Sequence, residues 1–199
     1  IALRDAQDVW IYDFGLRLPA GVDFDEERST AVIDALRLLW REQIEQAGFN
    51  ALVVRTGMSW WQANILRAYA KYLRQAGTTF SQGYIEQALV EHAALAEGIV
   101  ELFEARFDPG REGEAIEALV ERIEAQLAEV ASLDQDHILR SLLALVRGTL
   151  RTNAYRLDDD GNRRTALVRI MLGQRSDSMN SARLGCQWSR NRATKRGES

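Results

Sequence analysis

The stretch SWWQANILRAYAKYLRQAG (residues 59–77) decides the fold class, because it carries its own start signal, stop signal and apolar face. Ser59 stands where an N-cap is expected, and Gln62 follows at the spacing of a capping box. Gly77 is the residue type that favours the left-handed conformation just after a helix. The buried stripe is expected at helical spacing, on Ile65, Tyr69, Tyr72 and Leu73. We therefore predict a helix over residues 60–75.

A second, longer helix is expected after this one. Ser81 is its predicted N-cap, and the sequence DPG at residues 108–110 ends it, because proline cannot continue a helix. One apolar stripe spans the whole interval and contains Ile85, Ala88, Leu89, His92, Leu95, Ala96, Ile99, Leu102 and Phe103. Since the stripe is uninterrupted, it predicts one helix, with His92 as a satisfied core or boundary histidine.

An amphipathic pattern precedes these two helices. Apolar residues recur there at helical spacing, at Val32, Leu36, Leu39, Trp40 and Ile44. The expected helix ends before Gly48. Residues 49–54 form a short apolar piece that ends at Gly57. In the pair Trp60-Trp61, one ring is expected in the core and the other exposed or at an interface.

Two more helices are predicted after Pro109. The first has apolar residues in a 4-3-4-3 spacing, at Ile116, Val120, Ile123, Leu127 and Val130. That spacing is a heptad seam, so this helix should pack lengthwise and nearly antiparallel against another. The second is expected to begin at a capping Asp134, and it is lined by Ile138, Leu142, Leu145, Val146 and Thr149.

The two ends of the chain differ from this helical centre. Residues 9–14 (VWIYDF) read as a strand, and its sheet partners are expected outside this sequence. Residues 166–172 form an apolar run that fits a strand or a short helix equally well. Residues 176–199 are basic, serine-rich and aperiodic, which is typical of disorder. The predicted fold is mainly α: a multi-helix antiparallel bundle with an N-terminal orphan β-strand and a disordered C-terminal tail.

Composition narrows the function classes. The 199 residues carry a net charge of −4, with 46% hydrophobic and 27% charged residues, as in ordinary globular proteins. The negative net charge gives no reason to expect a nucleic-acid partner. No apolar run reaches the roughly 18 residues that are needed to span a membrane. The one cysteine, Cys186, cannot form an internal disulfide, and no signal peptide is evident. These features favour a cytoplasmic protein.

The residues that could act in catalysis or bind a metal or cofactor do not form any recognised motif. The chain lacks GxGxxG and phosphate-loop patterns, and His92, His137 and Cys186 are too dispersed for a structural zinc site. His137, near a helix start, is interpreted as solvated or capping. The sequence DDDG at residues 158–161 suggests calcium, but an EF-hand in that register would need ligands at Arg156 and Leu167. We therefore predict no catalytic, cofactor-binding or metal-binding residues.

Several charged residues are expected to be only solvated. The pairs Glu101/Arg106 and Glu117/Arg122 are placed on helix surfaces, where charges usually serve only solvation. The basic tail contains Arg190, Arg192, Lys195 and Arg196, with only Trp188 as an interleaved aromatic residue. A solvated tail is therefore favoured over a nucleic-acid contact.

The chain resembles a known family in four stretches. The strongest likeness is RAYAKYLRQ (residues 67–75) together with LFEARFDP (residues 102–109). VWIYDFGL (residues 9–16) and LDQDHILR (residues 133–140) agree with it. These sequences look like those of the large bacterial NAD-specific glutamate dehydrogenases, and the likeness covers roughly residues 8–157.

The resemblance implies a division of the chain. Residues 1–22 would end an ACT-like α+β module, 23–156 would form a helical domain, and 157–175 a linker or short strand. Residues 176–199 match nothing in the family, and we hypothesise that out-of-frame translation produced a non-native tail. Reading the coding DNA in its other frames tests this, because a proline-bearing continuation should then be recovered.

The resemblance also implies a function. The parent enzymes convert L-glutamate, NAD and water to 2-oxoglutarate, ammonia and NADH in a catalytic region whose motifs do not map onto this chain. The chain would then be a regulatory or linker segment, inactive alone, that holds no NAD itself. Its partners would be the remaining domains of the parent chain and further copies in a homo-oligomer. The alternative is an independent helical interaction module, and tail-mediated nucleic-acid binding ranks third.

Overall fold

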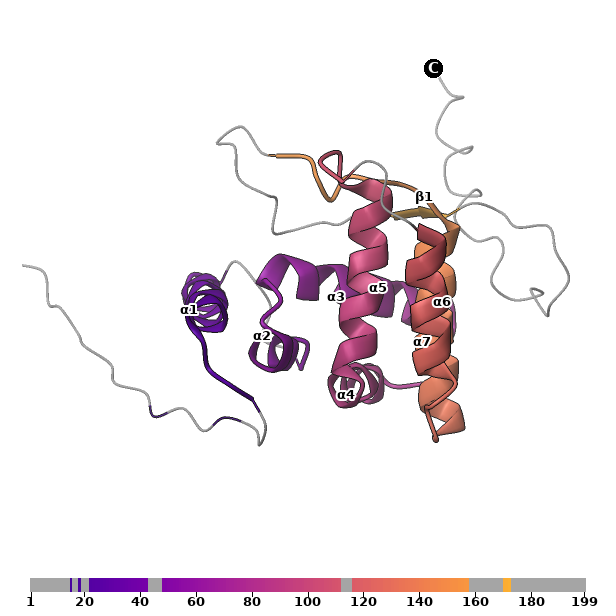
Figure 1. Cartoon of the computed structure of the whole chain (residues 1–199), viewed down its shortest axis with the longest axis horizontal. Coiled ribbons are helices and arrows are strands. Elements are labelled where there is room, and N and C mark those ends of the chain that lie inside the picture. Colours follow the sequence, from indigo (N-terminus) through magenta and orange to yellow (C-terminus); the bar gives the residue numbers. More distant parts are fainter. Residues whose placement is uncertain are drawn as a thin grey trace, which may run out of the picture.

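The protein is mainly helical, as the sequence predicts. The structure, a computed structural model, describes residues 15, 18, 22–42, 48–111, 116–157 and the backbone of 170–172. Its helices and strands are labelled in Figure 1 and are α1 (Glu26–Trp40), α2 (Asn50–Thr56), α3 (Trp60–Gln75), α4 (Gln82–Glu91), α5 (Ala93–Phe107), α6 (Ile116–Leu127), α7 (Leu133–Gly148), β1 (Thr149–Thr152) and β2 (Ile170–Leu172). The expected N-terminal strand (residues 9–14), the turn at 158–162 and the tail (176–199) lie outside the described residues.

Helix α3 has both of its predicted end signals. Ser59 Oγ accepts a hydrogen bond from the Gln62 backbone N–H (3.3 Å), and Gln62 Oε1 accepts one from the Ser59 N–H (2.8 Å). Gly77 has a φ of 90°, and the Thr78 N–H donates to the Leu73 carbonyl at 3.2 Å. This is a Schellman motif, in which the left-handed glycine lets the chain turn back over the last carbonyls. Local sequence alone therefore fixes both ends of α3.

The predicted single helix after Ser81 is wrong, because it is two helices that meet at His92. Ser81 caps α4 as expected, but His92 leaves the helical region (φ −107°, ψ 53°) and α5 starts at the next residue. Figure 1 shows α4 nearly end-on and α5 lengthwise, so the chain turns sharply here. The His92 ring lies 3.0 Å (Nε2 to Oε1) from Gln135 of α7. The bend lets α4 and α5 each pack on α7. The spacing of apolar residues in the sequence does not reveal this packing.

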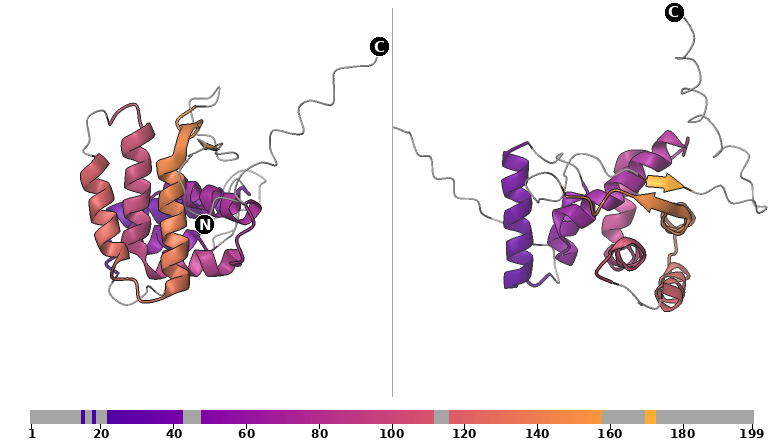
Figure 2. Two further views of the ribbon diagram at one scale, coloured as in Figure 1. Left: turned by 90° about the vertical axis from the view of Figure 1, so that its right-hand side faces the viewer. Right: turned by 90° about the horizontal axis from the view of Figure 1, so that it is seen from above.

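Helices α5, α6 and α7 lie side by side, with α5 between the other two, and α6 runs opposite to α5 and α7 (Figure 2, left). The predicted heptad seam is confirmed, because α6 packs lengthwise on α5 and buries Ile123 and Leu127 fully. Gly98 of α5 faces this seam: a Cβ built there would lie 3.1 Å from Ile123 Cγ1. The missing side chain thus sets how closely the two helices approach.

The buried face of α1 differs from the predicted stripe. Val32 and Ala35 are buried, whereas Leu36 and Trp40 are 48% and 71% exposed. The helix ends at Trp40 instead of continuing toward Gly48. Helix α1 packs mainly on α2, and Leu36 and Trp40 lie outside the core although they share the helical spacing of Val32.

The end of α7 also differs from the prediction. Its N-cap is Ser132, not Asp134, with the Ser132 hydroxyl accepting from the Gln135 N–H. The helix stops at Gly148, so Thr149 belongs to β1 instead of the helix. Within the apolar run 166–172, the described backbone of β2 pairs antiparallel with β1, matching Thr149 to Leu172 and Thr152 to Ile170.

Candidate functional site

The histidines of the bundle do not come together. His92 lies at the α4–α5 corner against Gln135, and His137 is exposed beside the Phe80 ring, with ring centroids 5.9 Å apart. Among the described residues, no three histidine, cysteine or acidic side chains are grouped so as to hold a metal ion. Cys186 lies outside the described residues. The absence of catalytic and cofactor-binding residues therefore stays a prediction.

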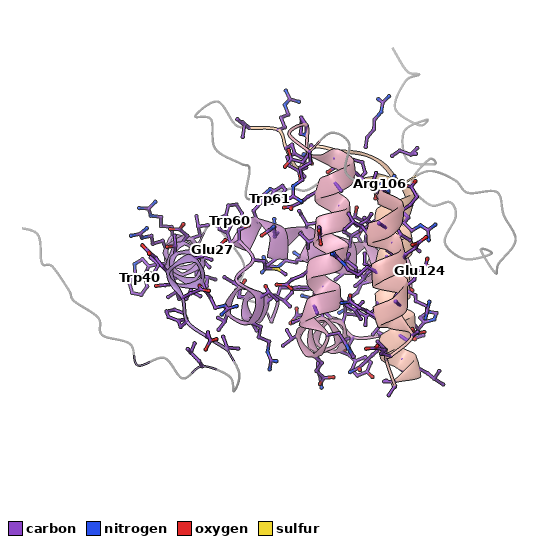
Figure 3. The ribbon with its side chains drawn as sticks, viewed as in Figure 1. Glu27, Trp40, Trp60, Trp61, Arg106 and Glu124 are labelled. Carbon is purple, nitrogen blue, oxygen red and sulfur yellow. The ribbon has the colours of Figure 1, made fainter. Side chains whose placement is uncertain are left out.

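Two open hollows mark the surface of the described part of the chain. The smaller, of about 330 Å³, lies between α5, α6 and α7, where Arg106 and Glu124 are labelled in Figure 3. Arg147 Nη1 is bound to Glu124 Oε1 across it at 3.0 Å. The larger, of about 630 Å³, lies between the α3–α4 turn and the start of α7, with Asp134, Asp136 and His137 in its wall. Both are wide open to solvent, so they lack the enclosure that small-molecule sites usually have.

A polar junction is buried where α3, α5 and α7 meet β1. Tyr69 and Thr149 are fully buried, and their hydroxyl oxygens lie 2.8 Å apart. Arg106 donates to the carbonyls of Val146 and Thr149, the latter at 3.1 Å. We name Tyr69, Arg106 and Thr149 the exit junction, because α7 ends at it.

Burial dominates the electrostatics of the exit junction. Burial raises the pKa of Tyr69 to about 12, against the opposing effects of the Thr149 hydrogen bond and the Arg106 charge. Burial also lowers the pKa of Arg106. The phenol is therefore neutral at physiological pH, which suits a hydrogen-bond donor.

The Arg106 position corrects one sequence expectation. Arg106 is not the solvated surface charge that was expected. Glu101 and Arg122 are not only solvated either, because they form an ion pair between α5 and α6. Arg106 instead lies half-buried over the Phe107 ring, with Cζ 5.1 Å from the ring centroid.

A second buried contact links α3 to α5. Glu104 is only 7% exposed, and its carboxylate accepts from Gln62 Nε2 at 2.9 Å and pairs with Arg111 Nη2 at 3.0 Å. Gln62 is also the capping-box residue of α3. The start of α3 is therefore tied to the end of α5 through one buried carboxylate.

The most prominent exposed feature is an apolar strip on α1. Ile33, Leu36 and Trp40 are 44%, 48% and 71% exposed, and we call them the outer face of α1. Figure 2 (right) shows α1 at the edge of the bundle, and Figure 3 shows Trp40 on the side of α1 away from it. The strip adjoins the buried residues Val32 and Ala35, so the apolar surface of α1 is wider than the part that the bundle covers. The outer face therefore has the character of an interaction surface.

The tryptophan pair behaves as the sequence suggested. Trp61 is 3% exposed, whereas Trp60 is partly buried at the edge of the core. The described residues contain no helix that is long and apolar enough to cross a membrane.

Two family models match the chain. Residues 44–109 match "Glutamate dehydrogenase, helical motif 3", and residues 122–184 match "Bacterial NAD-glutamate dehydrogenase, catalytic domain". The second match begins inside α6 and extends into residues 176–199. It therefore crosses the expected divisions at residues 157 and 176, and the expectation that nothing after residue 175 matches the family is wrong for residues 176–184.

Curated relatives agree with these models. Proteins named NAD-specific glutamate dehydrogenase are 42% identical over 161 residues in Mycobacterium tuberculosis, 38% over 155 in Halomonas elongata and 34% over 169 in Pseudomonas aeruginosa. The matches cover 76%, 76% and 81% of this chain but about 10% of each relative. The chain thus spans about a tenth of the length of these relatives.

Proposed function

Because the chain corresponds to one segment of the large NAD-specific glutamate dehydrogenases, we propose that it is a regulatory and linker helical segment of such an enzyme. The parent would oxidise L-glutamate with NAD and water to 2-oxoglutarate, ammonia and NADH. This segment contributes packing surfaces, while the reacting groups and the NAD site lie elsewhere in the parent. A cytoplasmic setting goes with this proposal.

The observation that carries the proposal is the outer face of α1. Ile33, Leu36 and Trp40 keep apolar surface in water, and fully burying one such side chain against a partner stabilises a protein by about 1.5–3 kcal/mol. The remaining domains of the parent chain are the proposed occupants, and self-association into a homo-oligomer is the proposed alternative use. Both would bury the same strip.

The purified 199-residue chain is expected to fold as helices and to form no NADH from L-glutamate and NAD. The reason is that the proposed role is mechanical and assigns no reacting group to this segment. Circular dichroism checks the folding, and NADH absorbance checks the turnover. A full-length NAD-specific glutamate dehydrogenase in the same buffer is the positive control, and turnover by the segment itself would refute the proposal.

Changing the outer face of α1 is expected to lower association without unfolding the bundle. In the triple variant Ile33→Gln, Leu36→Gln and Trp40→Gln, the free energy of unfolding should move by less than about 1 kcal/mol, because exposed sites contribute little. Sedimentation velocity should show less self-association, and an apolar dye should bind less. As a matched control, Val32→Gln on the buried side should destabilise clearly. Equal destabilisation by the triple variant would show that the outer face is part of the core.

A further inference from the structure

The exit junction contains a one-way chain of hydrogen bonds. Thr149 Oγ1 donates its only proton to the Leu145 carbonyl at 2.7 Å. In the 2.8 Å contact with Tyr69, the phenol must therefore be the donor and Thr149 the acceptor. The raised pKa of Tyr69 keeps that proton in place. Each hydroxyl is thus satisfied in one arrangement only.

Arg106 completes the junction from the opposite side. The last carbonyls of a helix have no partners within the helix, and a cation there is favourable. From α5, the Arg106 guanidinium binds the Val146 carbonyl in the last turn of α7 and the Thr149 carbonyl just after the helix. The Thr149 backbone is already extended (φ −70°, ψ 126°), so the helix cannot continue past this point. The junction therefore fixes where α7 ends and in which direction β1 leaves.

The chain after β1 returns to the same place. The Tyr155 ring packs edge-on against Trp61 and stacks on Phe103, with centroid distances of 5.1 Å and 6.3 Å. Phe103 also contacts the Tyr69 ring, at 6.1 Å. Residues on both sides of β1 are thereby held by α3 and α5.

The two sides of the junction belong to different family models. Tyr69, Phe103 and Arg106 lie in the segment matched by helical motif 3, and Thr149 and Tyr155 lie in the segment matched by the catalytic domain. The buried contacts therefore cross from one model to the other. The surface contacts of Gln135 with Glu91 and of Arg122 with Glu101 cross in the same way but are exposed.

We propose that Tyr69 and Arg106 are positioning residues that set the exit of α7, and that through them the helical motif holds the first part of the segment matched by the catalytic-domain model. The role of these residues in a full-length enzyme rests on the proposed function. The local structure that it predicts can be measured in the chain itself. Neither residue is assigned any contact with substrate or cofactor.

Hydrogen exchange on the 199-residue chain tests the proposal. In Thr149→Val, the shape is kept but the acceptor for Tyr69 and the bond to Leu145 are lost. The amides of residues 149–156 should then exchange roughly tenfold faster, since a buried hydrogen-bonding group is left unsatisfied. In Thr149→Ser, which keeps the hydroxyl, exchange should remain close to that of the unchanged chain. Arg106→Met should also accelerate exchange at 149–156, whereas Arg106→Lys should recover only part of the protection.

Two comparisons keep the result decisive. Arg122→Met removes the exposed contact with Glu101 and should leave residues 149–156 unchanged. If Thr149→Val and Arg106→Met instead accelerate exchange equally in α4, α6 and residues 149–156, their role is general stability and the proposal fails. It also fails if Thr149→Ser behaves as Thr149→Val does. Turnover of glutamate by the segment would remove the proposed function but would not alter these exchange results, so the two failures are distinguishable.

Discussion

Replacing Phe103 with alanine is expected to lower the free energy of unfolding by about 3–5 kcal/mol, the largest effect of any single change considered. Phe103 is fully buried, and its ring contacts those of Tyr69, Phe107 and Tyr155 at centroid distances of 6.1, 5.1 and 6.3 Å. Truncation removes all three ring contacts and leaves a cavity between α3, α5 and the segment after β1. Urea unfolding followed by circular dichroism measures the loss.

Phe103→Leu is the matched comparison, because it keeps most of the apolar volume. It should cost clearly less than Phe103→Ala, and Phe107→Ala should also cost less, since Phe107 is only partly buried. A loss below about 1 kcal/mol for Phe103→Ala would contradict the packing described for the centre of the bundle.

Gly98→Leu is expected to lower the free energy of unfolding by about 1–3 kcal/mol through overpacking. Even a Cβ at position 98 would lie 3.1 Å from Ile123 Cγ1, and the longer leucine side chain must displace α6 from α5. This loss would exceed the gain of roughly 1 kcal/mol that a helix obtains when glycine is replaced by a better helix former. Thermal and urea unfolding of the variant check the direction.

Gly83→Ala separates the gain in helix propensity from the steric clash. Gly83 lies in α4 with open space where a Cβ would be, so alanine there should stabilise by about 0.5–1 kcal/mol. Combining Gly98→Leu with Ile123→Ala should recover part of the loss, because the two sites share one space. Stabilisation by Gly98→Leu alone would show that α5 and α6 are not closely packed.

The helix ends that follow from local chemistry were predictable from the sequence. Ser59, Gln62 and Gly77 specify α3 because each acts within a few residues of itself. The corner at His92 was missed, since both helices that meet there bury the same apolar stripe. Spacing reports which side of a helix is buried, but it does not report a change of axis.

The exit junction was missed for a different reason. Arg106 was expected to be a solvated surface charge, whereas its partners are the carbonyls of Val146 and Thr149. Every residue has a main-chain carbonyl, so hydrogen bonds to carbonyls cannot be predicted from the pattern of residue types. Likewise, Val32 and Leu36 are neighbours on one side of α1, and only packing shows that Val32 is buried while Leu36 is 48% exposed.

The contacts of Phe103, Arg106 and Tyr69 with residues 146–155 have a consequence for how such genes can be rearranged. A recombination event between residues 109 and 122 would join parts of two different parent genes. Each part would encode only one side of the buried aromatic cluster and of the exit junction. A mismatched pair would leave unsatisfied hydroxyls and voids, so such hybrids should be lost by instability. The helical motif and the first helices of the catalytic region should therefore be inherited together.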